Sequence, residues 1–101
     1  MADAGAIIAG VGKPAVSEKW YPVDVAIALQ NMIIAATSLG YGTCWIGAFD
    51  QAEVKAALDL PEEMTVVALT PVGVPADHPD ARPRMPMREF ASKDRYGEEL
   101  W

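Results

Sequence analysis

The amino-acid sequence predicts one small layered domain of the α/β or α+β class. Three apolar segments rich in β-branched residues alternate along the chain with two helical patterns, and a charged, proline-rich segment follows. Because sheets and helices bury their apolar faces against each other in layers, this order favours a sheet covered by helices. The 101 residues are enough for a single domain, residues 1–101, in which residues 75–101 are expected to form an extended tail.

The first two predicted elements are a strand and a long helix. Residues 4–12 (AGAIIAGVG) are small and apolar, as is typical of a buried strand. We expect a helix over residues 24–39, which Asp24 caps and Gly40 ends. Apolar side chains form one face of this helix and fill much of the rest, at Val25, Ile27, Leu29, Met32, Ile33, Ile34 and Ala36. A helix that is apolar nearly all round is expected to be buried nearly all round.

The remaining predicted elements are shorter. Residues 41–46 are a strand candidate, and residues 64–74 (MTVVALTPVGV) form another strand rich in β-branched side chains. Between them we expect a second helix, which Asp50 caps and Pro61 ends. Pro71 has no N–H to donate to a neighbouring strand, so it indicates an edge strand or the end of the strand.

The composition predicts a partner and excludes some functions. Hydrophobic residues make up 51% of the chain, which is high for a small domain with much surface for its volume. We therefore expect at least a homodimer, formed through the helix at residues 24–39. The net charge of −6 opposes binding to nucleic-acid backbones. The longest apolar stretch is too short and polar to span a bilayer, no convincing signal peptide is present, and we expect a cytoplasmic protein.

No side chain is a convincing catalytic group or metal ligand. His78 lies in a proline-flanked polar segment without partners at metal-ligand spacing, so we expect an exposed loop histidine. Cys44 has no evident base nearby, and we interpret it and Trp45 as packing residues. The pair Gly10 and Gly12 suggests a dinucleotide-binding turn, but a third glycine and a following helix are missing, so we reject that interpretation.

Two features can bind a ligand. Gly47 lies between a strand and a helix, where the missing Cβ lets a planar ligand approach free backbone N–H groups. A plain strand-to-helix turn also explains this glycine, and the residues alone favour that explanation. Arg82 and Arg84 lie two residues apart in an extended segment, so they can form a two-pronged anion clamp. A solvated linker explains the arginines as well as a clamp does.

Three segments together resemble a known family. The run from Asp24 to Asp50 (DVAIALQNMIIAATSLGYGTCWIGAFD), the strand TVVALTPVGVPAD and the segment RPRMPMREF are similar in order and spacing to the C-terminal half of FMN-dependent nitroreductases. The resemblance implies a three-layer α+β half-fold: a small sheet, a long buried helix, a short helix and an extended C-terminal tail. It also implies an intertwined homodimer, with the helix at residues 24–39 packed at the interface.

The resemblance further implies the cofactor and its site. FMN would lie at the dimer interface, receive electrons from NAD(P)H and pass them to nitroaromatic or quinone-like acceptors. Ile46 and Gly47 match residues beside the flavin ring, where backbone amides contact its edge. Arg82 and Arg84 match residues that hold the FMN phosphate.

The sequence departs from the family in length. Members are usually close to twice as long, and their N-terminal half carries an Arg-x-Ser-x-Arg type motif that does not occur here. Two functions remain open. The first is an FMN-dependent oxidoreductase, which binds FMN either alone or only when a second chain that supplies the N-terminal half completes the site. The second is a truncated, non-enzymatic dimerisation module that binds no flavin.

Overall fold

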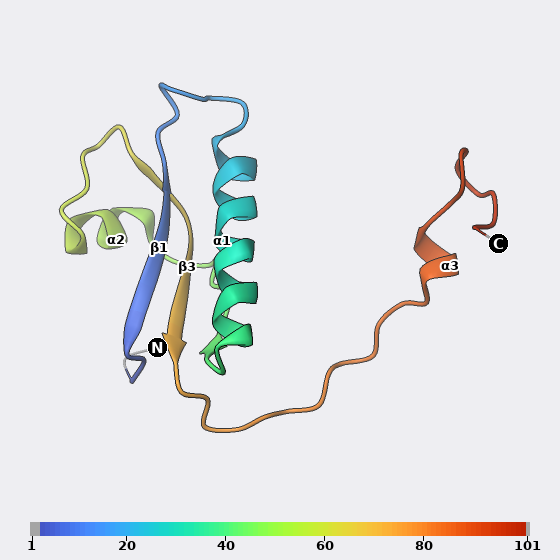
Figure 1. Ribbon diagram of the computed structural model, residues 1–101. Helices are drawn as coiled ribbons and strands as arrows, with labels where there is room; N and C mark the ends of the chain where they lie inside the picture. Colours follow the sequence, from blue (N-terminus) through green and yellow to red (C-terminus); the bar gives the residue numbers. More distant parts are fainter. Residues whose placement is uncertain (1–2, 101) are drawn as a thin grey trace.

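A central antiparallel sheet separates two helices in the computed structural model, which describes residues 3–100. The sheet contains β1 (Ala6–Gly12), β2 (Gly42–Thr43) and β3 (Thr65–Gly73), in the order β1-β3-β2. Figure 1 shows the long helix α1 (Tyr21–Ser38) and the short helix α2 (Gln51–Ala57) on opposite sides of the strands. The α+β fold class predicted from the sequence is therefore confirmed.

Glycines in β1 bring α1 close to the sheet. A Cβ added at Gly10 would collide with Leu29 and would lie 2.8 Å from Val25 Cγ1, and one at Gly12 would lie 3.1 Å from Tyr21 Cβ. Any larger side chain would push the helix away from the strand. Both glycines lie within the strand and serve this packing, which agrees with rejecting a dinucleotide-binding turn.

The start of α1 differs from the prediction. The helix begins at Tyr21, its N-cap is Trp20, and no side chain caps it. The assignment of Asp24 as the capping residue is wrong, because Asp24 lies inside the first turn. Pro22 explains the earlier start, since proline in the first turn has no N–H to leave unpaired and its φ angle suits a helix.

The end of α1 agrees with the prediction. Gly40 has a φ angle of +88°, a left-handed conformation that costs little only for glycine. The N–H of Tyr41 donates to Ala36 O at 3.0 Å and that of Gly40 donates to Thr37 O at 3.0 Å, the paired hydrogen bonds of a Schellman motif.

Pro71 lies in the central strand of the sheet, so its interpretation as an edge or terminal residue is wrong. The backbone of Leu69 bonds to Ile46 on the β2 side, and residue 71, two positions on, faces the same side. Extending the β2–β3 register places Cys44 opposite Pro71. There the ladder is interrupted, which explains why the strand expected over residues 41–46 is reduced to Gly42–Thr43 and a bridge at Ile46.

The helix α2 begins as predicted and ends earlier. Asp50 is its N-cap, and the carboxylate accepts a hydrogen bond from the Glu53 N–H at 3.0 Å. The helix ends at Ala57, well before Pro61, because Asp59 adopts a left-handed conformation with φ of 53°. The N–H of Leu60 then donates to Lys55 O at 3.0 Å and closes a second Schellman motif.

The core is small and α1 is not buried all round. Within residues 3–100 the buried residues other than the glycines of β1 are Leu29, Val66, Ala68, Leu69 and Thr70. Within α1 only Leu29 is buried, while Val23, Ile27 and Ile34 are 46%, 58% and 59% exposed. The expectation of a fully buried helix is therefore wrong for the single chain, because three short strands cover only one side of it.

The chain after β3 leaves the sheet. Residues 74–86 contain no helix or strand, and the short helix α3 (Met87–Phe90) contacts no other element. Figure 1 shows this arm, residues 74–100, running away from the strands on the side of α1. The radius of gyration is 17.3 Å, whereas a compact chain of this length has about 13 Å. No helix within residues 3–100 is long and apolar enough to cross a membrane.

Candidate functional site

The segment between β2 and α2 is anchored at both ends. At one end Ile46 and Leu69 exchange two backbone hydrogen bonds, of 2.8 and 2.9 Å. At the other end Asp50 caps α2, and the Gln51 side-chain amide bonds to both backbone groups of one residue of β3. The intervening residues 47–49 are therefore held in a fixed position beside the sheet.

Gly47 offers an open backbone position in this segment. It is exposed, and a Cβ built on it would meet only the Trp45 Nε1 atom, 3.8 Å away. Within the described residues its N–H donates to no acceptor. A planar ligand can therefore approach the Gly47 N–H without obstruction from this chain.

Ile46 differs from Gly47 in the use of its backbone. Its N–H already donates to Leu69 O, so it has no free donor for a ligand, and its side chain is half-buried. In a binding site, Ile46 would therefore hold the peptide group of Gly47 in place. The two residues lie together as predicted, but only Gly47 supplies an unpaired N–H.

Gln51 is a positioning residue that the sequence did not single out. Its Nε2 donates to Val66 O at 2.9 Å, and its Oε1 accepts from the Val66 N–H at 2.7 Å. The Gln51 side chain thus pairs with the backbone of β3 as a neighbouring strand would, beyond the bridge between Ile46 and Leu69. The only sequence signal is a glutamine next to a helix cap, and its partner lies fifteen residues away.

The structure corrects the interpretation of Cys44 and Trp45 as packing residues. Cys44 is exposed and Trp45 is 44% exposed. The cause is the interrupted ladder opposite Pro71, where Cys44 donates its N–H to the Thr70 hydroxyl instead of to a strand carbonyl. Within residues 3–100 the one hydrogen bond of the thiol is donated to the Trp45 carbonyl oxygen, at 3.9 Å.

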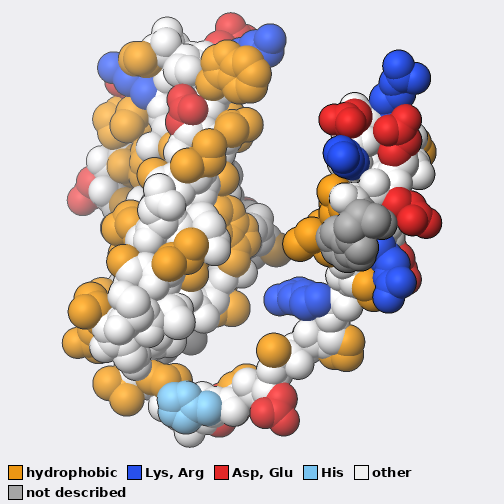
Figure 2. All heavy atoms as spheres, turned by 45° about the vertical axis from the view of Figure 1, so that its right-hand side comes forward, with side chains coloured by type: hydrophobic (Ala, Val, Ile, Leu, Met, Phe, Trp, Pro, Cys, Tyr) orange, Lys and Arg blue, Asp and Glu red, His pale blue; other side chains and the backbone are white. Residues whose placement is uncertain are grey.

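Arg82 and Arg84 lie on the arm, away from Ile46 and Gly47. Both are exposed, and neither forms an ion pair or a side-chain hydrogen bond within residues 3–100. Figure 2 shows the arm, with its basic side chains, standing apart from the body that carries the sheet. His78 lies on the same arm and is exposed, as expected. A single chain therefore does not bring the predicted site residues together.

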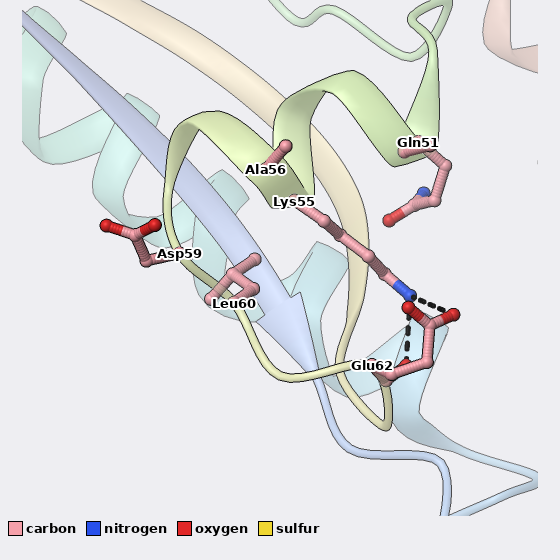
Figure 3. Close-up of a pocket in the computed structure, with 7 residues that line it drawn as sticks. Gln51, Lys55, Ala56, Asp59, Leu60 and Glu62 are labelled. Atoms are coloured by element: carbon pink, nitrogen blue, oxygen red, sulfur yellow. Dashed lines mark hydrogen bonds and ion pairs between the residues drawn. The ribbon is translucent and has the colours of Figure 1, made fainter.

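One hollow lies away from these residues. It has a volume of about 600 Å³ beside α2 and is lined by Gln51, Ala52, Lys55, Ala56, Asp59, Leu60 and Glu62. In Figure 3 the Lys55 side chain reaches Glu62, where its Nζ donates to the backbone oxygen at 3.1 Å and lies 3.9 Å from the carboxylate. The one cation of this hollow is thus already paired, and none of the predicted site residues lines it.

Comparison with known proteins gives one consistent family. The Nitroreductase family matches residues 1–74. An NADPH-dependent oxidoreductase of Staphylococcus epidermidis is 36% identical over 78 residues, which cover 73% of this chain and 31% of that protein. An FMN reductase (NADPH) of Bacillus subtilis is 34% identical over 76 residues, which cover 73% and 30%.

A similar solved structure points to the same family as these two relatives. The nitroreductase family protein from Clostridium novyi NT has a TM-score of 0.69 and 37% identity, over 97% of this chain and 55% of that one. The chain spans about a third of the length of the two curated relatives. Because the family match covers most of the sequence and includes the whole sheet with α1 and α2, the chain belongs to the nitroreductase family.

Proposed function

We propose that the protein is an FMN-dependent oxidoreductase of the nitroreductase type. It would take electrons from NAD(P)H and pass them to nitroaromatic or quinone-like acceptors. The observation that carries the proposal is the exposed, unpaired N–H of Gly47 in a segment anchored by Ile46 and Asp50. Relatives named as an FMN reductase and as an NADPH-flavin oxidoreductase support the choice of cofactor.

The residues present fit half of an FMN site. The Gly47 N–H can donate to an acceptor atom on the edge of the ring, and the absent Cβ leaves room for a planar system. Arg82 and Arg84 have no ion pair within residues 3–100, and their guanidinium groups suit a phosphate. FMN, when bound, would supply the electron transfer, while this chain would orient the ring and hold the phosphate. No side-chain acid, base or nucleophile is required of the chain.

The site needs a second chain, which we propose to be another copy bound through α1. Val23, Ile27 and Ile34 lie on one side of α1, away from the buried Leu29, and form an exposed apolar stripe. Burial of this exposed α1 stripe would remove apolar area from water and bring a second chain next to the arm. A polypeptide corresponding to the missing N-terminal half is the further partner proposed here.

A second candidate function is a dimerisation module that binds no flavin. It is favoured by the arm, which holds Arg82 and Arg84 apart from Gly47 in the single chain. The chain matches only about a third of the length of these two curated relatives, and this also favours a module that binds no flavin. The retained arginine pair opposes it, since a module without a ligand gains nothing from unpaired cations on an arm.

The visible absorption spectrum of the purified protein separates the two functions. An oxidoreductase should show flavin absorption and a released mass equal to that of FMN, either alone or when co-expressed with an N-terminal half from a relative. The variant Arg82→Ala/Arg84→Ala should lose about 1.5–3 kcal/mol of FMN binding per charged hydrogen bond removed. Arg88→Ala/Arg95→Ala on the same arm is the matched control and should bind normally. A colourless protein under both conditions would favour the dimerisation module.

A further inference from the structure

The indole N–H of Trp45 lies beside the open backbone position of Gly47. Trp45 Nε1 is the one atom within 4 Å of a Cβ built on Gly47, at 3.8 Å, once the chain neighbours of the glycine are set aside. Two bonds of about 1.5 Å join the Gly47 nitrogen to that Cβ position, so the two nitrogens lie no more than about 7 Å apart. A side-chain donor and a backbone donor therefore border the same small area.

The backbone fixes the position of this indole. On one side Cys44 donates its N–H to the Thr70 hydroxyl at 3.3 Å, and on the other Ile46 exchanges two backbone hydrogen bonds with β3. Trp45 lies between these two anchored residues. Because side chains two positions apart in an extended segment project to the same side, its indole points to the side of Gly47.

Trp45 lies on the face of the sheet that carries α1. Gly10 faces α1, because a Cβ there would collide with a side chain of that helix. Ala68 is paired with Gly10 and shares this face. The next residue of β3, Leu69, and its bridge partner Ile46 therefore face the other way, and Trp45 faces α1 again. A second chain bound through the exposed α1 stripe would approach from the side of the indole.

Neither of the two donors is used within residues 3–100. The Gly47 N–H and the Trp45 Nε1–H make no hydrogen bond there, and Trp45 is 44% exposed, so water solvates the indole N–H in the single chain. A ring laid on the Gly47 peptide would displace water from both donors, because they are so close. The indole N–H can only donate, so a ligand without a second acceptor would leave it unpaired and would bind more weakly.

We propose that Trp45 is a ligand-selecting residue, whose indole N–H donates to a second acceptor on the edge of the ring that Gly47 binds. This inference rests on the proposed function, because it concerns the same flavin-binding segment. The ligand chemistry that it specifies is a planar ring with two hydrogen-bond acceptors side by side on one edge. The isoalloxazine ring of FMN carries such a pair, a ring nitrogen next to a carbonyl oxygen.

Removal of the N–H alone tests the proposal by equilibrium dialysis. Trp45→Phe keeps an aromatic ring and deletes the donor, so the dissociation constant of FMN should rise about three- to tenfold. Trp45→Ala should raise it at least as much. The matched control is Trp20→Phe, the same change at a tryptophan just before α1 that is 53% exposed, and it should leave the dissociation constant unchanged. Each protein is measured alone and co-expressed with an N-terminal half from a relative.

The indole proton reports the contact directly. In the nitrogen–proton correlation NMR spectrum of the full chain, the Trp45 indole signal is identified by its loss in Trp45→Phe. Addition of FMN should shift this signal downfield and slow its exchange with water, because the proton would be donated to the ligand and covered by it. The Trp20 indole signal, identified in the same way, should stay unchanged.

The results separate the role of Trp45 from flavin binding itself. Equal dissociation constants for the wild type and Trp45→Phe, with weaker binding by Trp45→Ala, would show that the indole only packs against the ring. That result would overturn the assignment of Trp45 and leave the proposed function standing, and so would an indole signal that FMN does not change. Absence of FMN binding by the wild type under both conditions would contradict the proposed function, and the assignment of Trp45 with it.

Discussion

At the scale of single residues, Thr70 compensates for a proline in the middle of the sheet. Pro71 cannot donate a hydrogen bond toward β2, and the ladder is interrupted there. The Thr70 hydroxyl accepts from the Cys44 N–H at 3.3 Å and donates to Pro71 O at 3.1 Å, so it bridges the gap. Thr70 is 1% exposed, so its hydroxyl finds its partners within the sheet and not in water.

Thr70→Val should therefore destabilise the protein although it keeps the shape of the side chain. It leaves the Cys44 N–H and the Pro71 carbonyl without their partner, at a cost of about 1–3 kcal/mol in the free energy of unfolding. Urea denaturation measures this cost. Thr65→Val, at a position of β3 whose side chain makes no hydrogen bond within residues 3–100, is the control. If both variants lose the same stability, the hydroxyl bridge has no structural role.

At the scale of elements, the two Schellman motifs end α1 and α2 with different residues. Gly40 adopts its left-handed conformation at little cost, whereas Asp59 has a Cβ that is crowded there. The sequence contains a glycine signal for the first helix end and none for the second. That is why the end of α1 was predictable and the end of α2 was placed too late, at Pro61.

Substitutions at the two positions should have opposite effects on stability. Asp59→Gly should raise the free energy of unfolding by up to about 1 kcal/mol, and Gly40→Ala should lower it by about 1–2 kcal/mol. Thermal melting followed by circular dichroism gives both signs. Because neither Gly40 nor Asp59 lies within the segment between β2 and α2, any flavin affinity should stay constant. A stabilising Gly40→Ala variant would contradict the assignment of these helix ends.

The strands, α1 and α2 and their order along the chain were predictable because each depends on local patterns, whereas α3 lies in the segment that was expected to be extended. The β-branched runs, the helical spacing and the Asp50 cap all lie within a few residues of the structure that they specify. The position of Pro71 in the central strand was not, because strand order depends on pairings between distant segments. The Gln51–Val66 contact was missed for the same reason, and the exposure of Cys44 follows from the interrupted ladder.

The candidate site was predictable only in part. The sequence places Ile46 and Gly47 together because they are adjacent, and the structure adds that only Gly47 has a free N–H. The roles of Arg82 and Arg84 depend on where the arm lies in an assembly, which no local pattern determines. Ile46, Gly47, Arg82 and Arg84 therefore stay predicted FMN contacts.

At the scale of the whole molecule, two features are the basis for proposing that the chain works in an assembly. The arm extends away from the body, and the exposed α1 stripe is apolar. A small sheet with one long helix offers no surface that could cover the arm or the exposed α1 stripe. Association through α1 would bury the stripe and place a neighbouring chain beside the arm.

Charge on the stripe should weaken this association. Ile27→Glu/Ile34→Glu would put carboxylates into an apolar contact and should shift the mass measured by light scattering from a dimer toward 10.8 kDa, the mass of one chain. Ala28→Glu/Ala35→Glu, which adds the same charge to the same helix at exposed positions away from the stripe, is the control. A wild-type protein that is monomeric over the accessible concentrations would contradict the α1 interface.

The most direct test of the account is the dissociation constant of FMN for the wild type and for Gly47→Trp, measured by quenching of flavin fluorescence in the presence of the completing partner. A Cβ at Gly47 meets only Trp45 Nε1 at 3.8 Å, so the substitution should leave the fold intact while its ring covers the open N–H. The account predicts tight, saturable binding by the wild type and by the control Val16→Trp, and at least tenfold weaker binding by Gly47→Trp. Equal affinities of Gly47→Trp and the wild type would show that flavin does not lie against this segment.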